Sequence, residues 1–379
     1  MNWHGNRFGE EYTYVKVSPY DWTEQGTYDY ITSGSIEMSD DNKYKVTGSF
    51  QFNGPVLPDP GMFLRVYYSF YDDEGEVADE LLATLYTSYS SVQYNDSSQG
   101  TLYSGTLNGS SILQILDDKK YGQPFIIKKN SNAIYKAFEI IEEFGLRVDY
   151  TPSSKVISTD HTFGGDNSYL DIVTWLCDFA GYRQPFVSSE GVIQLQPIVK
   201  PEDQKDPLVF RDDSQSIMYP EVDSDNDWQT KANVVKKIYN TDRAWAIATA
   251  KNIRGSKMSL ENVPWHEITL IDEISDVDNG KNILTQLLDK AEKDLREEAN
   301  ESEYVTFSHA YVPIELKKAV KIEYSDMEWL GSAENISIDL SPATKTQTKI
   351  KKTIEHNIEV ERSGFIKPRD GEREEYGGN

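Results

Sequence analysis

The spacing of apolar residues predicts strands towards both ends of this 379-residue chain and helices in its middle. In residues 1–110 apolar and polar positions alternate, as they do in strands with one buried face. The clearest case is Ser33–Gly54, which alternates on both sides of the turn signal Ser39–Asn42, and two further β-prone runs flank Asp72–Gly75. Because no long helical pattern occurs here, we expect a small barrel or sandwich.

Between residues 124 and 200 the apolar spacing becomes helical, and one small unit occurs twice. The first copy, Ser131–Tyr150, has apolar residues three and four apart, and its Gly145 suits the left-handed residue that follows a helix end. The second copy, Asp166–Pro197, has the same order of capped helix, glycine and strand. Two such units predict a compact α/β layer.

The last third of the chain returns to strands after a long helix. Residues 201–230 are polar and strongly acidic, with nine acidic residues against two basic ones, and are typical of a connector. A strand is expected at Asn233–Tyr239. An amphipathic helix is predicted from about Asn282 to Glu298, and alternating strands follow it. A helix between strands of one meander indicates an insertion.

The predicted fold class is therefore α+β multidomain, with two small β-barrel domains, a central α/β region and an inserted long helix. The domains are expected at these residues: a first β-barrel at 1–110, the α/β region at 111–206 plus about 240–305, a second β-barrel at 207–239 plus about 306–360, and a charged, flexible tail at 361–379.

The net charge of -25 narrows the possible partners. Double-stranded DNA and anionic membranes would be repelled by such a surface, whereas a conduit through which DNA passes without binding would favour it. Simple solubility explains the same charge equally well. No segment reaches the roughly 18 apolar residues needed to span a bilayer, and the N-terminus has no apolar core of a signal peptide. Cys177 is the single cysteine, so an internal disulfide is impossible and a reducing cytoplasm fits.

The best metal-like string is Asp223, Asp225 and Asp227, whose alternating carboxylates are spaced as in a calcium loop. A helix–loop–helix calcium site would need a glycine where Trp228 stands and a glutamate where Val234 stands. An exposed acidic turn is therefore the main interpretation, and ion binding is the alternative.

No other group forms a recognisable catalytic set. The five histidines are too far apart in sequence for metal-ligand spacing, and Cys177 lies on an apolar helix stripe, which indicates core packing. The remaining candidates are read as solvated acids, a helix-cap turn and a strand residue: Glu142–Glu143, Asp72–Asp73, Phe163–Asp166 and His309. We therefore expect no enzyme activity, no catalytic or cofactor-binding residues, no metal and no cofactor.

The order of these elements resembles that of phage tail hub (baseplate hub) proteins. The likeness covers about residues 20–355. The segments that carry it are Ser33–Gly54 with Leu64–Ser88 for the first barrel, Phe125–Leu146 with Phe163–Pro197 for the α/β region, and Phe210–Trp228, Asn233–Tyr239 and Glu334–Lys349 for the second barrel.

The resemblance implies a structural virion protein. Three copies are expected to form a ring of six similar barrels, which adapts a six-fold tail tube to a three-fold tail tip and leaves a channel for DNA. The implied partners are a homotrimer, the tail tube or distal tail protein ring, the tail tip, spike or receptor-binding complex, and the tape-measure protein. The implied location is the virion tail, assembled in the bacterial host cytoplasm.

Two other classes stay open as alternatives. A carbohydrate-binding adhesin or receptor-binding tail protein would also be β-rich and rich in tyrosine, of which this chain has 24, and would be expected to show a clustered aromatic platform. A cell-wall hydrolase would need paired carboxylates or a Cys/His pair in a cleft.

Overall fold

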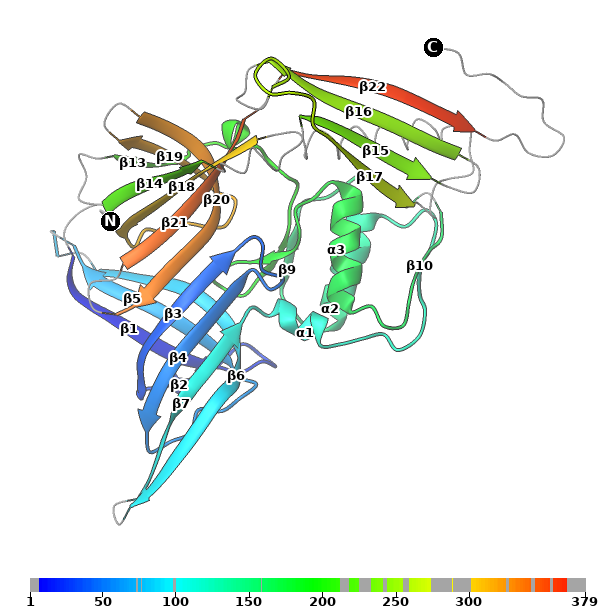
Figure 1. The fold of residues 1–379 in the computed structure, drawn as a ribbon. Coiled ribbons are helices and arrows are strands. Elements are labelled where there is room, and N and C mark those ends of the chain that lie inside the picture. Colours follow the sequence, from blue (N-terminus) through cyan, green and yellow to red (C-terminus); the bar gives the residue numbers. More distant parts are fainter. Residues whose placement is uncertain are drawn as a thin grey trace.

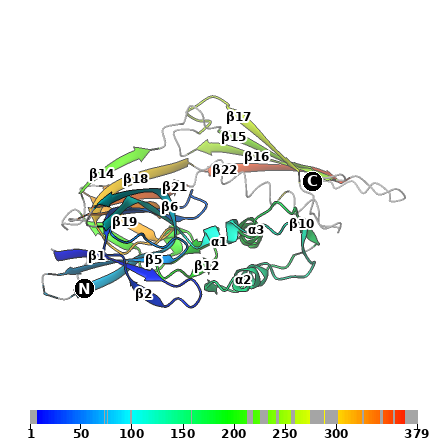
Figure 2. The same cartoon turned by 90° about the horizontal axis from the view of Figure 1, so that it is seen from below.

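The computed structural model describes these residues: 7–72, 74–75, 77–97, 100–157, 159–211, 218–224, 233–240, 244–254, 259–273, 288, 301–324, 327–341, 345–354 and 357–366. Within them the chain is mostly β. One 13-stranded sheet dominates, with a four-stranded sheet, two small sheets and three short helices beside it (Figures 1 and 2).

The 13-stranded sheet consists of two β units. The strands of the first unit are β1 (Phe8–Val17), β2 (Glu24–Thr27), β3 (Ile31–Ser39), β4 (Val46–Gly54), β5 (Phe63–Tyr71), β6 (Val77–Ser97) and β7 (Gly100–Ser110). The strands of the second unit are β13 (Leu208–Arg211), β14 (Met218–Ser224), β18 (Glu301–Ala310), β19 (Ala319–Tyr324), β20 (Met327–Leu340) and β21 (Lys345–Ile354).

The two units share one pairing scheme. In space the first unit runs β3-β4-β7-β6-β5-β1, with β2 at its end, and the second runs β14-β18-β21-β20-β19-β13. Strands at equal places in the two paths also come in the same order along the chain. One pair differs, because β1 is antiparallel to β5 whereas β13 is parallel to β19. The chain therefore contains the same strand order twice, with one difference in strand direction.

A single strand pair joins the units. β20 lies antiparallel to β3, from Asn335 opposite Ser39 to Leu340 opposite Gly34. The side chains of Asn335 and Glu37 also hydrogen-bond across this joint, at 3.2 Å from Nδ2 to Oε1. Both units bury their apolar faces in one common cluster, which contains Phe50 and Phe307.

The expectation of two barrels is wrong for the described sheets, none of which closes on itself. Closure of a barrel would need the two end strands of each unit to pair with each other. Instead, the outer edge of β3 pairs with β20, so that the sheet of one unit continues into the other. The apolar residues then fill one shared core and not two separate ones.

Residues 111–206 contain helices and short strands, as the sequence predicts for this part of the α/β region. Its helices are α1 (Leu113–Asp117), α2 (Ala133–Glu143) and α3 (Tyr169–Ala180). Its short strands are β8 (Phe125–Ile127), β9 (Val148–Tyr150), β10 (His161–Phe163), β11 (Phe186–Val187) and β12 (Ile193–Leu195), and the 3-10 turn η1 (Pro201–Asp203) leads out of it.

Both copies of the repeated unit are confirmed. Asn132 caps α2, and Ser168 caps α3 in a reciprocal capping box with Asp171. Gly145 and Gly181 follow the helices with φ of 68° and 76°, a left-handed conformation that glycine adopts without a Cβ clash. The strands β9 and β12, which follow the two helices, pair in parallel. The helices pack in one cluster with residues of β1 and β5, so the α/β region packs against the first β unit.

The four-stranded sheet is a separate element beyond the α/β region. Its order is β17 (Glu267–Glu273), β15 (Val234–Asn240), β16 (Ala244–Arg254) and β22 (Asn357–Ile366). β15, expected in the second barrel, thus pairs with β16 and β17 and not with that unit. The expected helix at 282–298 lies outside the described residues except for Leu288, which packs against this sheet.

The shared core predicts that both units unfold together. We expect Phe50→Ala and Phe307→Ala each to lower the free energy of unfolding by about 3–5 kcal/mol, because each removes a fully buried ring. Urea unfolding followed by circular dichroism and by tryptophan fluorescence should shift by the same amount in both variants. Phe8→Ala, at a ring that is 58% exposed, is the control and should change little. Two separate transitions would contradict a common core.

Candidate assembly surfaces

The candidate ion site is not assembled in the part of the chain that the structure describes. No group of three or more His, Cys, Asp or Glu side chains there could hold a metal ion. Asp223 lies on β14 opposite Tyr304 of β18. Asp225 and Asp227 lie outside the described residues, so ion binding by this string stays a prediction.

The described histidines lie in packed or hydrogen-bonded surroundings. His309 is fully buried on β18, where its Nε2 lies 2.8 Å from Thr348 Oγ1 and its ring stacks with Phe307. His161 stacks on Trp175 with ring centroids 4.0 Å apart. The backbone N–H of His266 donates to Asn233 Oδ1 at 2.9 Å, and its carbonyl accepts from the backbone N–H groups of Asn233 and Val234. His4 and His356 lie outside the described residues.

The other sequence candidates are also dispersed. Glu142 and Glu143 are at the end of α2, where Glu143 is exposed, and Asp72 accepts a hydrogen bond from the backbone N–H of Glu74 at 3.0 Å. Asp73 lies outside the described residues. The turn before α3 does contain two glycines, and it leads into the Ser168 cap described above.

Cys177 is fully buried in the core of the α/β region, and burial raises the pKa of its thiol to about 12. We therefore predict that a thiol reagent does not label the folded chain at neutral pH and labels one thiol per chain after unfolding in guanidinium. Fast labelling of the native protein would show that this helix opens or that the thiol is accessible.

A cluster of charged residues holds the two units and the α/β region together near the β3·β20 joint. Lys317 Nζ lies 2.7 Å from Asp40 Oδ2 and also pairs with Glu334. Lys45 is 2% exposed, pairs with Asp40 at 3.5 Å and donates to Gln184 Oε1 at 2.9 Å. We call Asp40, Lys45, Lys317 and Glu334 the junction cluster.

The backbone at both lysines of the junction cluster is unusual. Lys45 and Lys317 have φ of 63° and 64°, in the left-handed region that non-glycine residues rarely adopt. Their ammonium groups both reach Asp40, which comes directly after β3. The ion pairs thus accompany two tight turns whose conformation is unfavourable by itself.

Burial and charge act in opposite directions on this cluster. Burial alone would raise the pKa of Asp40, but its hydrogen bond and charge interaction with Lys317 outweigh this and hold the pKa below its usual value. Burial likewise opposes the charged form of Lys317, and the Glu334 and Asp40 carboxylates more than offset this and raise the pKa of Lys317. Nearby, burial lowers the pKa of Arg183 to about 10. Asp40 and Lys317 are therefore both charged at neutral pH.

We predict that Asp40→Asn lowers the free energy of unfolding at pH 7 by about 1–3 kcal/mol, because it removes a charged acceptor from two partly buried lysines. Since the folded-state pKa of Asp40 is depressed, its contribution is present above the pKa of the unfolded carboxyl, about 3.9, and is lost as the pH falls through the folded value. The two proteins should thus converge in stability once the pH lies below the folded-state pKa of Asp40. Asp59→Asn, at an exposed pair with Lys16, is the control and should change stability by less than about 1 kcal/mol.

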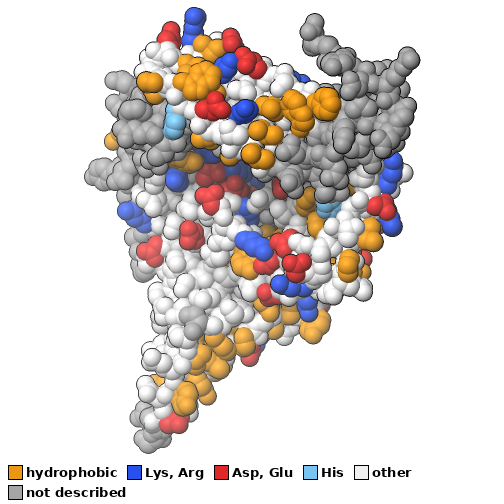
Figure 3. All heavy atoms as spheres, turned by 45° about the vertical axis from the view of Figure 1, so that its right-hand side comes forward, with side chains coloured by type: hydrophobic (Ala, Val, Ile, Leu, Met, Phe, Trp, Pro, Cys, Tyr) orange, Lys and Arg blue, Asp and Glu red, His pale blue; other side chains and the backbone are white. Residues whose placement is uncertain are grey.

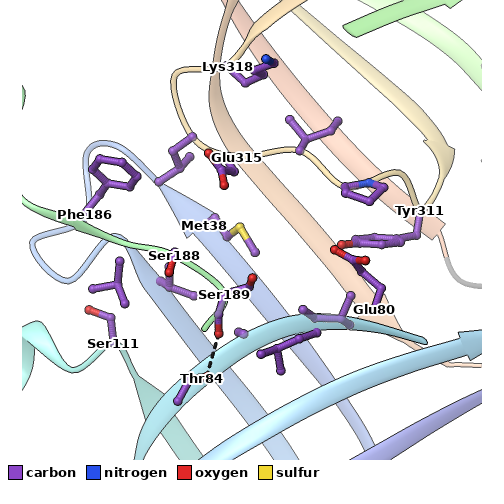
Figure 4. A pocket seen from close by; sticks show the side chains of 18 residues that line it. Met38, Glu80, Thr84, Ser111, Phe186, Ser188, Ser189, Tyr311, Glu315 and Lys318 are labelled. Atoms are coloured by element: carbon purple, nitrogen blue, oxygen red, sulfur yellow. Dashed lines mark hydrogen bonds between the residues drawn. The ribbon is translucent and has the colours of Figure 1, made fainter. Parts of the chain in front are cut away.

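A cavity of about 350 Å³ lies between β6, β11 with the two residues that follow it, and the loop at 311–318 (Figure 4). Thr84 Oγ1 donates to the carbonyl of Ser189 at 2.7 Å on one side of it. Glu80 lies beside Tyr311 at the other, and burial raises the pKa of Glu80. Its walls come from the first unit, the α/β region and the second unit, so the cavity marks the seam between them.

Exposed aromatic side chains do not form one platform among the described residues. The most exposed rings are spread over the molecule: Phe8 on β1 with Tyr71 opposite it on β5, Tyr20 before β2, Tyr94 on β6, Tyr135 on α2 and Trp265 before β17. This distribution does not favour a sugar-binding platform of the kind expected for an adhesin.

Two of the strand edges that remain open in the described part of the sheet belong to β6 and β14. β5 covers the outer edge of β6 only as far as Tyr86, and no described strand covers the rest, up to Ser97. At the other end of the sheet β14 pairs only with β18. The β6–β7 ribbon projects from the body as a narrow arm (Figure 1), and hydrophobic side chains gather along it (Figure 3). Such edges are sites at which another strand can add.

Among the described residues, no helix is long and apolar enough to cross a membrane. A comparison with protein-family models finds no match, and neither does a comparison with curated sequences.

Solved structures share this fold. A tail protein from Neisseria meningitidis has a TM-score of 0.61 at 14% identity, over 90% of this chain and 96% of that one. The 43 kDa tail protein of prophage MuSo2 from Shewanella oneidensis has a TM-score of 0.59 at 10% identity, over 90% and 98%. A chain of the Francisella PdpA–VgrG complex, in its lidless form, has a TM-score of 0.58 at 10% identity, over 91% and 65%. The fold is that of phage tail proteins, as the resemblance implied.

Proposed function

We propose that this chain is a structural protein of a phage tail, the baseplate hub, and that three copies form a ring of six similar β units. The observation that carries the proposal is the repeated pairing scheme, in which one chain contains the same strand order twice and joins the two units edge to edge. The shared fold with solved tail proteins supports it.

Two similar units per chain suit a protein that lies between a six-fold and a three-fold partner. Three chains with two similar units each can present six similar positions to a six-fold partner, while the ring as a whole keeps three-fold symmetry. The two units also differ in structure, and a three-fold partner can bind to features that only one of them has. The β15–β17 strands are inserted after β14 in the second unit, and the long β6–β7 arm belongs to the first.

The proposed partners are those that the resemblance to phage tail hub proteins implies. One face of the ring would contact the tail tube or distal tail protein ring, and the other the tail tip, spike or receptor-binding complex, with the tape-measure protein as a further neighbour. The protein would be located in the virion tail, assembled in the host cytoplasm, and would act without catalysis.

The net charge of -25 suits a channel for DNA. DNA phosphates are repelled by a surface of the same sign, so DNA can pass through such a ring without being held by counterion release. Weak binding is an advantage in a conduit, whereas it would be a defect in a DNA-binding protein.

Sedimentation of the full chain tests the proposal. We expect a concentration-dependent species of three times the 43.2 kDa chain mass, and electron microscopy of that species should show a ring with six similar lobes. Antibodies against the chain should label the tail end of purified virions. A monomer at every concentration, together with the absence of the chain from virion tails, would contradict the proposal.

A further inference from the structure

We propose that neighbouring copies join by strand pairing between the open edge of β6 in one copy and the open edge of β14 in the next, in the register that β20 and β3 use within the chain. This inference rests on the proposed ring and names the edges that build it. The chain itself contains one example of the joint, so the geometry of the second can be derived from the first.

The two units can be aligned by strand pairing alone. In the first unit, Tyr86 of β6 pairs with Phe63 of β5 on one side and with Ser110 of β7 on the other. In the second unit, Ser332 of β20 holds the same position between β19 and β21. Tyr86 and Ser332 therefore mark equivalent points on equivalent strands.

The same steps align β14 with β3. The β7 residue that pairs with Tyr86 also pairs with Thr47 of β4, and Thr47 pairs with Glu37 of β3. The β21 residue that pairs with Ser332 also pairs with Tyr304 of β18, and Tyr304 pairs with Asp223 of β14. Glu37 and Asp223 are thus equivalent. The alignment also matches two buried rings, Phe50 and Phe307.

Beyond the markers the two units differ in one respect. The outer edge of β20 is covered by β3 from Asn335 to Leu340, whereas the equivalent stretch of β6 has no partner strand in the described chain. β14 is the equivalent of β3, and among the described strands only β18 pairs with it, so that no described strand covers its outer edge. Each copy therefore has one half of the joint at each end, which is the requirement for a head-to-tail ring.

Burial along the two equivalent strands supports this difference. Ile338 and Leu340 of β20 are 1% and 3% exposed, since they face the shared core beside the joint. Their equivalents on β6 are Val92 and Tyr94, which are 37% and 71% exposed. Apolar residues thus occur at the same alternate positions in both strands. In β6 these apolar side chains are exposed, and the next copy would cover them.

The alignment fixes a register between copies. Across the new joint we expect antiparallel pairs between β6 and β14, namely Tyr89 with Ser224, Ser91 with Asp223, Val92 with Val222, Gln93 with Glu221 and Tyr94 with Pro220. Pro220 has no N–H to donate, so the ladder is expected to end there.

Disulfide trapping tests this register. Val92→Cys with Val222→Cys places two thiols directly opposite each other, where Cβ atoms of antiparallel strands lie about 4.5–5.5 Å apart, close enough to be bridged with a small local adjustment. Under mild oxidation we expect covalent dimers and trimers on a non-reducing gel. Gln93→Cys with Val222→Cys is the matched control, because a shift of one residue turns the side chain to the other face. The native Cys177 is buried and should not interfere.

The outcomes separate the edge assignment from the proposed function. Trimers that cross-link at 92–222 but not at 93–222 support the inference. Trimers that form without the 92–222 cross-link, or that cross-link at 93–222 in its place, overturn the edges or the register and leave the ring itself standing. A chain that stays monomeric, with no trimer to trap, overturns both.

A second variant avoids dependence on thiol chemistry. A lysine on an open strand edge is a device that blocks edge pairing. We expect Val92→Lys to raise the concentration for half-dissociation of the trimer at least tenfold without changing monomer circular dichroism. Val77→Lys is the control, since Val77 is 58% exposed on the part of β6 that already pairs with β5. Equal effects of the two lysines would contradict a specific role for the open edge.

Discussion

The pairing of β3 with β20 is the constraint on which the rest of this architecture depends. It joins two sheets of the same strand order into one. The sheet of each unit therefore continues into the other unit and does not close into a barrel. The common core follows from it, because the inner faces of both units then enclose the same space. The junction cluster lies beside the same pair, where Asp40 follows β3 and Glu334 lies on β20. Backbone pairing, core and ion pairs thus reinforce one another at a single place.

The parts of this fold that depend on nearby residues could be predicted from the sequence. The helices α2 and α3 begin at Asn132 and Ser168 and are followed by glycines because capping and left-handed termination are local effects. The strands β3 to β6 could be predicted from local patterns as well, since alternation and β-prone runs indicate strands. The buried, structural role of His309 also follows from its place on an alternating strand.

Pairing between distant strands could not be predicted in this way. β16 pairs with β22, which is more than a hundred residues away. The residue pattern of neither strand indicates which strand it pairs with. A barrel was expected because the strand pattern of residues 1–110 has no long helix, whereas closure depends on which strand each edge pairs with. The junction cluster was missed for a similar reason. Lys45 and Lys317 are unremarkable in sequence and become neighbours only after the two units join.

The place of the insertion has a consequence for how such a chain can change. In the first unit, β3 passes to β4 through a short turn, and in the second unit the equivalent turn, from β14 to β18, carries the β15–β17 strands. Because loop-closure entropy grows only with the logarithm of loop length, such a replacement costs little as long as both ends stay in place. The turn is therefore a permissive grafting point. A whole module can be exchanged there while the paired strands on either side keep their register.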